Sequence, residues 1–307
     1  MKYRITHITT YHYAHEVGLC QNEARLKPRD FPRQQCSASR FDINPEPSDF
    51  QERLDFFGNR IAYFAIQKPH SQLTVTAVSD VEVLTESNQV FQDNPISWED
   101  ARDKLSNNPA QQVQSQQTLG YGSYEALLEA RQYTLDSPMV TSGIELGDYA
   151  RPSFAPGASL IDAVTDLMKR IYQDFTYDPS FTTIATPLAD VMRHRRGVCQ
   201  DFAHLAIGCL RSLGLAARYI SGYIETLPAP GTERLVGADA SHAWFAVFVP
   251  GSGWLELDPT NNKLPADQHI TLAWGRDYAD VTPLKGIAFG GGKHSLSVSV
   301  DVLRLES

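Results

Sequence analysis

The stretch that decides the fold is residues 195–214, RRGVCQDFAHLAIGCLRSLG. After Gly197 its apolar residues recur with the period of a helix and form a stripe that ends before Gly214. This pattern predicts a helix packed on a core, with Cys199 in its first turn. The unpaired N–H groups and the positive dipole end at that turn favour a thiolate and can hold an oxyanion. Cys199 is therefore a candidate nucleophile.

The residues around this helix refine the interpretation of the cysteines. Arg195 and Arg196 precede the turn and are expected to add positive potential at the thiol. Cys209 lies ten residues after Cys199, within the apolar stripe, and is predicted to be an inert core residue. Four cysteines without CxxC or Cys/His metal spacing are too few for a disulfide framework in 307 residues. We expect free thiols.

A thiolate needs a partner that takes and returns a proton, and histidine suits this role near neutral pH. Among nine histidines, His242 stands out because it opens an apolar strand directly after a long loop, residues 226–240. The next strand ends at Asp258, where a carboxylate can orient the imidazole, the third role of a Cys-His-Asp triad. Taken singly, each residue has an ordinary alternative: an inert thiol, a structural histidine and a turn carboxylate.

The triad sets a condition on the two strands that carry His242 and Asp258. A four-residue turn pairing Val249 with Trp254 would place the two side chains on opposite faces, because side chains alternate along a strand. We therefore predict a five-residue turn or a bulge between residues 242 and 258.

Four other histidines have ordinary interpretations. His204 lies three residues after Asp201 and is interpreted as forming a local hydrogen-bonded pair with it. His7, His12 and His15 share one strand without the carboxylate or cysteine company of a metal site, so they are interpreted as solvated or paired residues.

Patterning divides the chain into three parts. Residues 1–95 contain period-2 runs of β-branched and aromatic residues, which predict an antiparallel β domain with a hairpin turn at Phe57-Gly58-Asn59. Residues 96–156 are interpreted as a helical connector. Residues 157–307 begin with an amphipathic helix capped by Ser159, carry the cysteine helix and its strands, and end in a half-buried closing strand.

Composition argues against several classes of function. The chain has 27 Lys+Arg and 36 Asp+Glu, a net charge of −9, and no basic cluster, so it lacks the charge that binds nucleic acid or anionic membranes. Its longest uninterrupted apolar stretch, Ala243–Val249, is far shorter than the roughly 20 residues that a membrane helix needs. The first residues contain no continuous apolar run typical of an export signal, so we expect a cytoplasmic protein with reduced thiols.

Four segments together resemble the core of the transglutaminase-like superfamily. They are RRGVCQDFAH at 195–204, LRSLGLAARYISGY at 210–223, SHAW at 241–244, and Gly253-Trp254 through LDPTN at 257–261. The resemblance covers residues 160–262. The β-rich first ninety residues and the segment 275–283 resemble the bacterial members with a dedicated N-terminal region. This implies an α+β, papain-like fold, in which the helix bearing the cysteine packs on an antiparallel sheet.

By position, the resemblance implies that Cys199 is the nucleophile, His242 the general base and then acid, and Asp258 the orienting carboxylate, with no metal or organic cofactor. The implied reaction is attack of the thiolate on an amide carbonyl, followed by acyl transfer to water or an amine. We expect a peptide or protein substrate and favour peptidase-like hydrolysis. A protein-glutamine transglutaminase and a non-catalytic binding module remain alternatives. Trp244 and Tyr177 are predicted either to line the site or to be core aromatics, and the Cys199 N–H is the candidate oxyanion donor.

Overall fold

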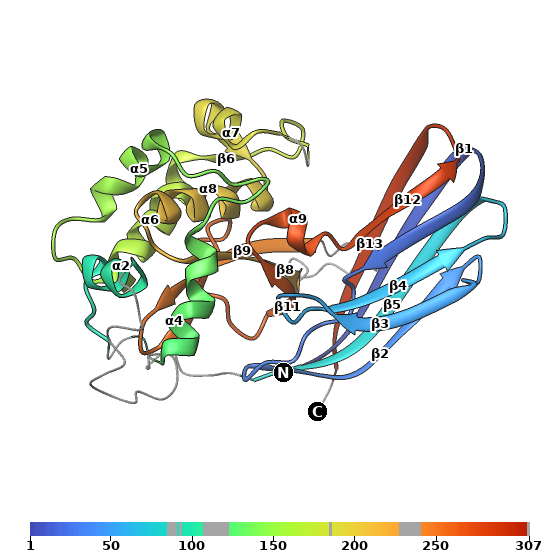
Figure 1. Cartoon of the computed structure of the whole chain (residues 1–307), viewed down its shortest axis with the longest axis horizontal. Helices are drawn as coiled ribbons and strands as arrows, with labels where there is room; N and C mark the ends of the chain where they lie inside the picture. The colour runs from blue at the N-terminus through green and yellow to red at the C-terminus, as the bar shows by residue number, and fades with distance from the viewer. Residues whose placement is uncertain (85–90, 92–93, 107–122, 184–185, 227–240, 306–307) are drawn as a thin grey trace, which may run out of the picture.

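The computed structural model of the chain is a mixed α+β fold (Figure 1). It describes residues 1–84, 91, 94–106, 123–183, 186–226 and 241–305. The predicted loop of residues 226–240, apart from Thr226, lies outside the described residues. No helix in these ranges is long and apolar enough to cross a membrane. A helical lobe with a small sheet lies beside a large curled sheet, with the short helix α9 (Tyr278–Val281) between them (Figure 1).

The large sheet is antiparallel throughout and is built around one long strand, β1, which pairs with four others. Polar and apolar residues alternate along these strands, so one face is buried. The predicted β structure of the N-terminal part is confirmed, and so is the hairpin at Gly58, whose φ of 74° favours glycine. The strands are β1 (Lys2–Ala24), β2 (Gln34–Asn44), β3 (Asp49–Leu54), β4 (Arg60–Ile66), β5 (His70–Val83), β12 (Leu284–Gly290) and β13 (His294–Leu305).

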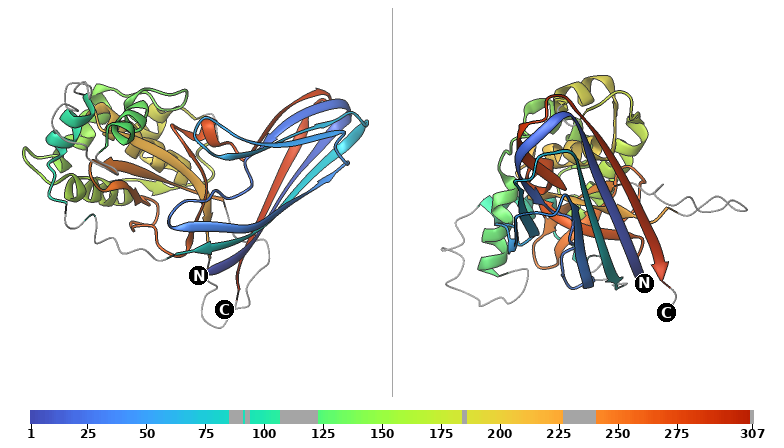
Figure 2. Two further views of the ribbon diagram at one scale, coloured as in Figure 1. Left: turned by 60° about the horizontal axis from the view of Figure 1, so that its bottom comes forward. Right: turned by 90° about the vertical axis from the view of Figure 1, so that its right-hand side faces the viewer.

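The closing strand belongs to a different sheet from the one its place in the chain suggests. We assigned it to the part spanning 157–307, but β13 pairs with β1 from Lys2↔Leu305 to Tyr13↔His294. Figure 2 shows these terminal strands side by side at the edge of the curled sheet. The two ends of the chain thus belong to one sheet. β1 and β13 each bury only one face, and pairing lets them bury that face against the same core.

The small sheet and its covering helices form the second core. Its antiparallel strands run in the order β10-β9-β8-β11, and α8 begins at Cys199 as predicted and ends before Gly214, whose φ is 78°. Cys209 on α8 is fully buried, which confirms its predicted place in the core. The strands are β8 (Ala217–Ile224), β9 (Ser241–Val249), β10 (Gly253–Leu257) and β11 (His269–Gly275); the helices are α6 (Leu160–Asp174), α7 (Leu188–His194) and α8 (Cys199–Ser212).

The connector contains helices, as predicted, which belong to the helical lobe (Figure 1). They are α2 (Trp98–Ser106), α4 (Tyr124–Arg131) and α5 (Ile144–Ala150), with 3₁₀ turns at Gln132–Thr134 and Arg151–Ser153. A short parallel ladder, β6 (Thr176–Tyr177) with β7 (Arg196–Gly197), fixes the chain directly before α8.

Two amide side chains of the N-terminal part satisfy the outer edge of β11. Gln34 donates to the carbonyl of Thr271 at 2.7 Å and accepts from its N–H at 2.8 Å. Asn59 donates to the carbonyl of Trp274 at 2.8 Å and accepts from its N–H at 2.9 Å. The curled sheet therefore caps an edge strand whose backbone groups would otherwise be unpaired.

We predict that Gln34→Ala lowers the free energy of unfolding by about 2–3 kcal/mol, because it leaves both buried backbone groups of Thr271 without partners. Urea denaturation followed by circular dichroism measures the change. Gln35→Ala, on the exposed neighbour, is the matched control and should change it by less than about 0.5 kcal/mol. Equal stability of the two variants would contradict the capping role.

Candidate active site

The first turn of α8 is shaped by a side chain that folds back on it. Asp201 is buried, and its carboxylate accepts a hydrogen bond from the N–H of Val198 at 2.8 Å. A Cβ on Gly197 would lie 2.7 Å from the Asp201 Cβ, so only glycine fits there. This arrangement places Cys199 as the first helical residue, where N–H groups have no partner within the helix.

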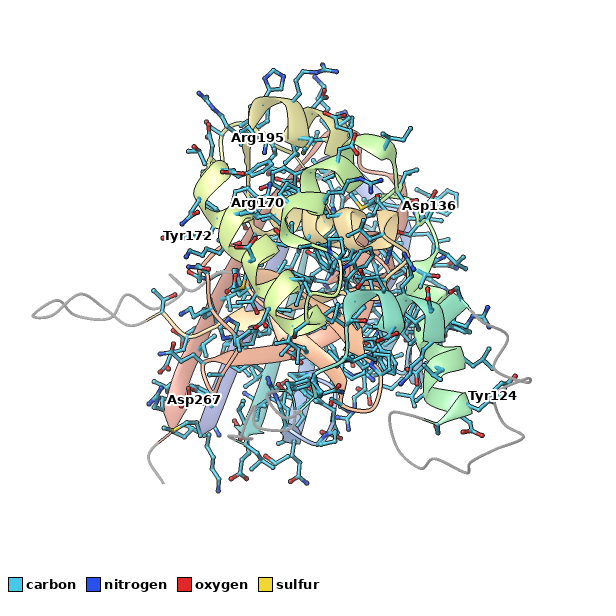
Figure 3. All side chains as sticks on the ribbon, turned by 90° about the vertical axis from the view of Figure 1, so that its left-hand side faces the viewer. Tyr124, Asp136, Arg170, Tyr172, Arg195 and Asp267 are labelled. Atoms are coloured by element: carbon cyan, nitrogen blue, oxygen red, sulfur yellow. The ribbon has the colours of Figure 1, made fainter. Side chains whose placement is uncertain are left out.

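The two arginines before this turn are engaged with carboxylates. Arg195 ends α7 in the left-handed conformation, with a φ of 54°, and its guanidinium lies 4.0 Å from Asp174. Arg196 lies 3.7 Å from Asp178. Figure 3 shows Arg195 at the outer side of the helical lobe. The positive potential expected at the thiol is therefore offset by these two acidic partners.

The strand pair that carries His242 and Asp258 differs from the prediction. Val249 pairs with Gly253, so the turn contains three residues, 250–252, and the ladder shows no register shift. The predicted five-residue turn or bulge is wrong. The three-residue turn nevertheless meets the condition, because continuing its register places Asp258 opposite Trp244, which shares a face with His242.

Asp258 is the centre of a buried hydrogen-bond network. Its Oδ2 lies 2.8 Å from Nε2 of His242, 3.1 Å from Nε2 of His269 and 2.7 Å from Nδ2 of Asn261. Its Oδ1 accepts from the N–H groups of Thr260 and Asn261 at 3.0 and 3.2 Å. The side chain of Asp258 has no solvent exposure. The carboxylate is thus held rigidly, with both oxygens occupied.

The pKa values of this pair are shifted in opposite directions. Burial alone would raise the pKa of Asp258, but hydrogen bonds from His242 and His269 outweigh burial and hold it well below its usual range. Burial alone would lower the pKa of His242, but the hydrogen bonds to Asp258 and Cys199 raise it to about 10. At neutral pH the pair is an ionised carboxylate and an imidazolium.

Cys199 and His242 line one cavity of about 270 Å³. Because Nε2 of His242 is engaged with Asp258, the ring nitrogen left for the Cys199 thiol is Nδ1. The cysteine side chain is partly exposed, whereas His242 is buried. The geometry presents a thiol to solvent, with a charged imidazole beside it and a carboxylate behind the ring.

Comparison with known proteins identifies the family. Residues 3–82 match the bacterial transglutaminase-like N-terminal region, and residues 148–259 match the transglutaminase-like superfamily. An uncharacterized protein of Mycobacterium tuberculosis is 42% identical over 99% of this chain and 93% of its own length. The chain belongs to the transglutaminase-like superfamily. An uncharacterized Mycobacterium leprae protein of similar length is 32% identical over 98% of both chains.

Two further matches to this superfamily member differ in coverage. A protein-glutamine gamma-glutamyltransferase of Pseudomonas aeruginosa is 30% identical, but the match covers 48% of this chain and 23% of that enzyme. A crystal structure from Cytophaga hutchinsonii, described as a "putative cysteine protease", superposes over all of this chain and 92% of its own with a TM-score of 0.71. Because the two chains are only 20% identical, this superposition shows a shared fold alone.

Trp244 and Tyr177, the two aromatic residues predicted near the transglutaminase-like site, differ in burial. Trp244 is fully buried below the two imidazoles, and its Nε1 donates to Glu256 at 2.9 Å. Gly222 makes room for it, because a Cβ there would lie 2.5 Å from the indole ring. Tyr177 is 53% exposed on β6, close enough to Cys199 for the thiol to contribute, after burial, to raising the tyrosine pKa. Tyr177 thus packs against Phe202 of α8 outside the residues that line the cavity at Cys199, and Trp244 lies behind His242.

The predicted pairing of His204 with Asp201 is wrong. Nε2 of His204 accepts the N–H of Tyr278 at 3.1 Å, and its ring packs on Tyr219 at 5.0 Å between centroids. Burial lowers the pKa of His204 to about 4, so it is neutral and acts as an acceptor. Asp201 instead accepts a hydrogen bond from the N–H of Val198 at the start of α8.

The strand histidines follow their interpretation as solvated or paired residues. His12 and His15 are exposed. His7 is buried and hydrogen-bonded, with 2.9 Å from its Nε2 to the hydroxyl of Thr9 and 3.0 Å from its Nδ1 to the hydroxyl of Tyr223.

His269 and Asn261 are site residues that sequence reasoning missed. With His242 and Asp258, His269 forms a group whose potential ligand atoms lie within 4.8 Å of one another. Both histidine nitrogens point at the same carboxylate oxygen, which also accepts from Asn261. The nitrogen and oxygen atoms that could bind a metal are thus already hydrogen-bonded to one another. Asn261 follows directly in the LDPTN segment, and His269, like His242, opens a strand of the small sheet.

Proposed function

We propose that the protein is a thiol-dependent amide or peptide bond hydrolase that acts through a thioester on Cys199. The observation that carries this proposal is the continuous series of contacts from the partly exposed thiol through His242 to the buried Asp258. Membership of the transglutaminase-like superfamily supports a thiol-dependent enzyme of this fold. The substrate we propose is a peptide or protein amide.

In the proposed reaction, the Cys199 thiolate attacks the amide carbonyl, and the helix-start N–H of Cys199 donates to the resulting oxyanion. The His242 imidazolium then gives its proton to the leaving amine or ammonia, which leaves a thioester. Water attacks the thioester and gives a proton to His242, which releases the acid and restores the thiolate. Asp258 keeps the imidazole oriented, with Nε2 toward the carboxylate. Trp244 supports the ring from below.

A protein-glutamine transglutaminase is the second candidate, favoured by the match to the Pseudomonas aeruginosa gamma-glutamyltransferase over 48% of this chain. It differs only in the acceptor, an amine in place of water. A glutamine-containing peptide library, incubated with and without an added primary amine and followed by both peptide cleavage and ammonia release, separates the two. Hydrolysis predicts peptide fragments, or side-chain amides in which NH₂ has been replaced by OH, and no amine incorporation in mass spectra. Absence of any turnover, with slow alkylation of Cys199, would instead support a non-catalytic binding module.

The raised pKa of His242 predicts an unusual alkaline limit of activity. The imidazolium is the proposed acid for the leaving group, and its pKa is raised from about 6.5 to about 10. kcat/KM should therefore persist through pH 8 and fall as the pH rises toward 10. The stability contributed by protonated His242 is fully present below pH 6.5 and is lost over the same rise. Stopped-time assays between pH 5 and 11, with circular dichroism at each pH, measure both; an alkaline limb centred near 6.5 would contradict the charged pair.

A further inference from the structure

The cavity at Cys199 has a wall that comes from the other sheet. Thr9 and Tyr11 on β1 line it, and so do their direct cross-strand partners on β13, Val298 and Leu296. Directly paired residues of antiparallel strands project from the same face. We call these four side chains the sheet wall. The two terminal strands of the chain therefore face the thiol and the imidazole across the cavity.

The sheet wall carries no net charge. Among the described residues that line the cavity there is no Lys, Arg, Asp or Glu. His7, which stands next to the wall on β1, has both ring nitrogens hydrogen-bonded, to Thr9 and to Tyr223. Burial lowers the pKa of His7 to about 4, so it is neutral at pH 7. Within the described lining, charge is therefore confined to the two reacting groups of the proposed mechanism, Cys199 and His242.

Two members of the sheet wall are apolar and stay half exposed. Leu296 is 49% exposed and Val298 is 51% exposed. A single exposed apolar residue needs no explanation. Here two of them stand on the same face of β13 and line the same cavity as the nucleophile. Tyr219 and Tyr278 extend the apolar lining on the catalytic side. Such a surface gains free energy when an apolar group covers it.

We propose that the sheet wall is the subsite for one uncharged apolar or aromatic side chain of the acyl donor, adjacent to the amide that Cys199 attacks. This inference rests on the proposed function. A volume of about 270 Å³ lies below the roughly 300–1,000 Å³ of pockets that take whole small-molecule ligands, which suits a single side chain. The occupant belongs to the donor, because the donor must be held when the thiol attacks, whereas the acceptor enters after the leaving group departs. A lysine or glutamate side chain would lose its hydration without gaining a partner.

Alkylation of Cys199 tests this without requiring turnover. N-acetylated chloromethyl ketones of leucine, phenylalanine, lysine and glutamate differ only in the side chain, and each forms a thioether with loss of chloride. Second-order rates are measured by intact-mass spectrometry and divided by the rate with iodoacetamide, which carries no side chain. We expect the leucine and phenylalanine reagents to react at least about tenfold faster than the charged pair, the scale of discrimination of an apolar pocket.

Variants on one strand identify the wall as the cause. Val298→Asp should remove the preference for the apolar reagents and favour the lysine reagent, and Val298→Trp should slow the apolar reagents by filling the cavity. Ser297→Asp adds the same charge on the opposite face of β13 and is the matched control, with wild-type ratios expected. Equal rates for all four reagents, or unchanged ratios in both Val298 variants, would overturn the inference.

The outcome is separable from that of the proposed function. If alkylation shows a side-chain preference but no amide is turned over, the hydrolase proposal is contradicted and the subsite proposal stands. If turnover depends on Cys199 but does not vary with the neighbouring side chain, the hydrolase proposal stands and the subsite proposal is contradicted.

Discussion

Amide turnover by the Cys199→Ala variant is expected to fall by at least about a thousandfold, because the thioester route is lost and only binding and oxyanion stabilisation remain. Cys199 is partly exposed at the start of α8, so the fold should tolerate alanine there. Cleavage of the best library peptide, or ammonia release from it, measures the effect. Circular dichroism melting of the variant shows whether the fold is retained.

Cys36→Ala is the matched control for this substitution. Cys36 is a half-buried free thiol in the curled sheet and does not line the cavity at Cys199. Its variant should keep wild-type turnover. Iodoacetamide should modify Cys199 much faster than Cys209, which is fully buried and whose pKa burial raises to about 12. A Cys199→Ala variant that keeps a tenth of the wild-type rate would exclude Cys199 as the nucleophile.

Local pattern predicted the parts of the site that local structure controls. The apolar stripe after Gly197 determines where α8 begins and which face it buries, so Cys199 and Cys209 could be separated from sequence. The alternation along β9 likewise predicted a strand opening at His242. A triad requires an odd number of residues in the β9–β10 turn, so that His242 and Asp258 share a face. The actual length of three residues is a property of the Pro250–Ser252 backbone, which the alternation of side chains does not encode.

Contacts between distant segments were beyond the sequence. The pairing of β13 with β1 joins residues about three hundred positions apart, and nothing in either strand names its partner. His269 reaches Asp258 only because β11 lies at the edge of the small sheet, a matter of topology. Closeness in sequence to Cys199 was also a poor guide to the effect of Arg195 on the thiol. Arg195 ends α7 in the left-handed conformation, and its guanidinium lies near Asp174.

Asp258→Asn is expected to lower kcat/KM by about a thousandfold to ten-thousandfold while Cys199 remains in place. An asparagine side chain cannot accept from the Nε2–H groups of both His242 and His269 and also from Asn261, as the carboxylate oxygen Oδ2 does. If His242 instead accepts from the new amide at Nε2, its proton moves to Nδ1, toward the thiol. The imidazole is then the wrong tautomer to act as a base.

The pH dependence separates this effect from simple unfolding. Loss of the Asp258 carboxylate removes the largest interaction that raises the pKa of His242, so the alkaline limb of residual activity should move from near 10 toward the ordinary value of about 6.5. A merely destabilised protein would lose amplitude at every pH and keep the position of the limb. Asp148→Asn, which removes one exposed carboxylate of the helical lobe, is the matched control and should change neither quantity. An unshifted limb in Asp258→Asn would mean that Cys199 alone raises the pKa of His242. The Asp258 carboxylate would then serve only to hold the loop that bears Asn261 in place.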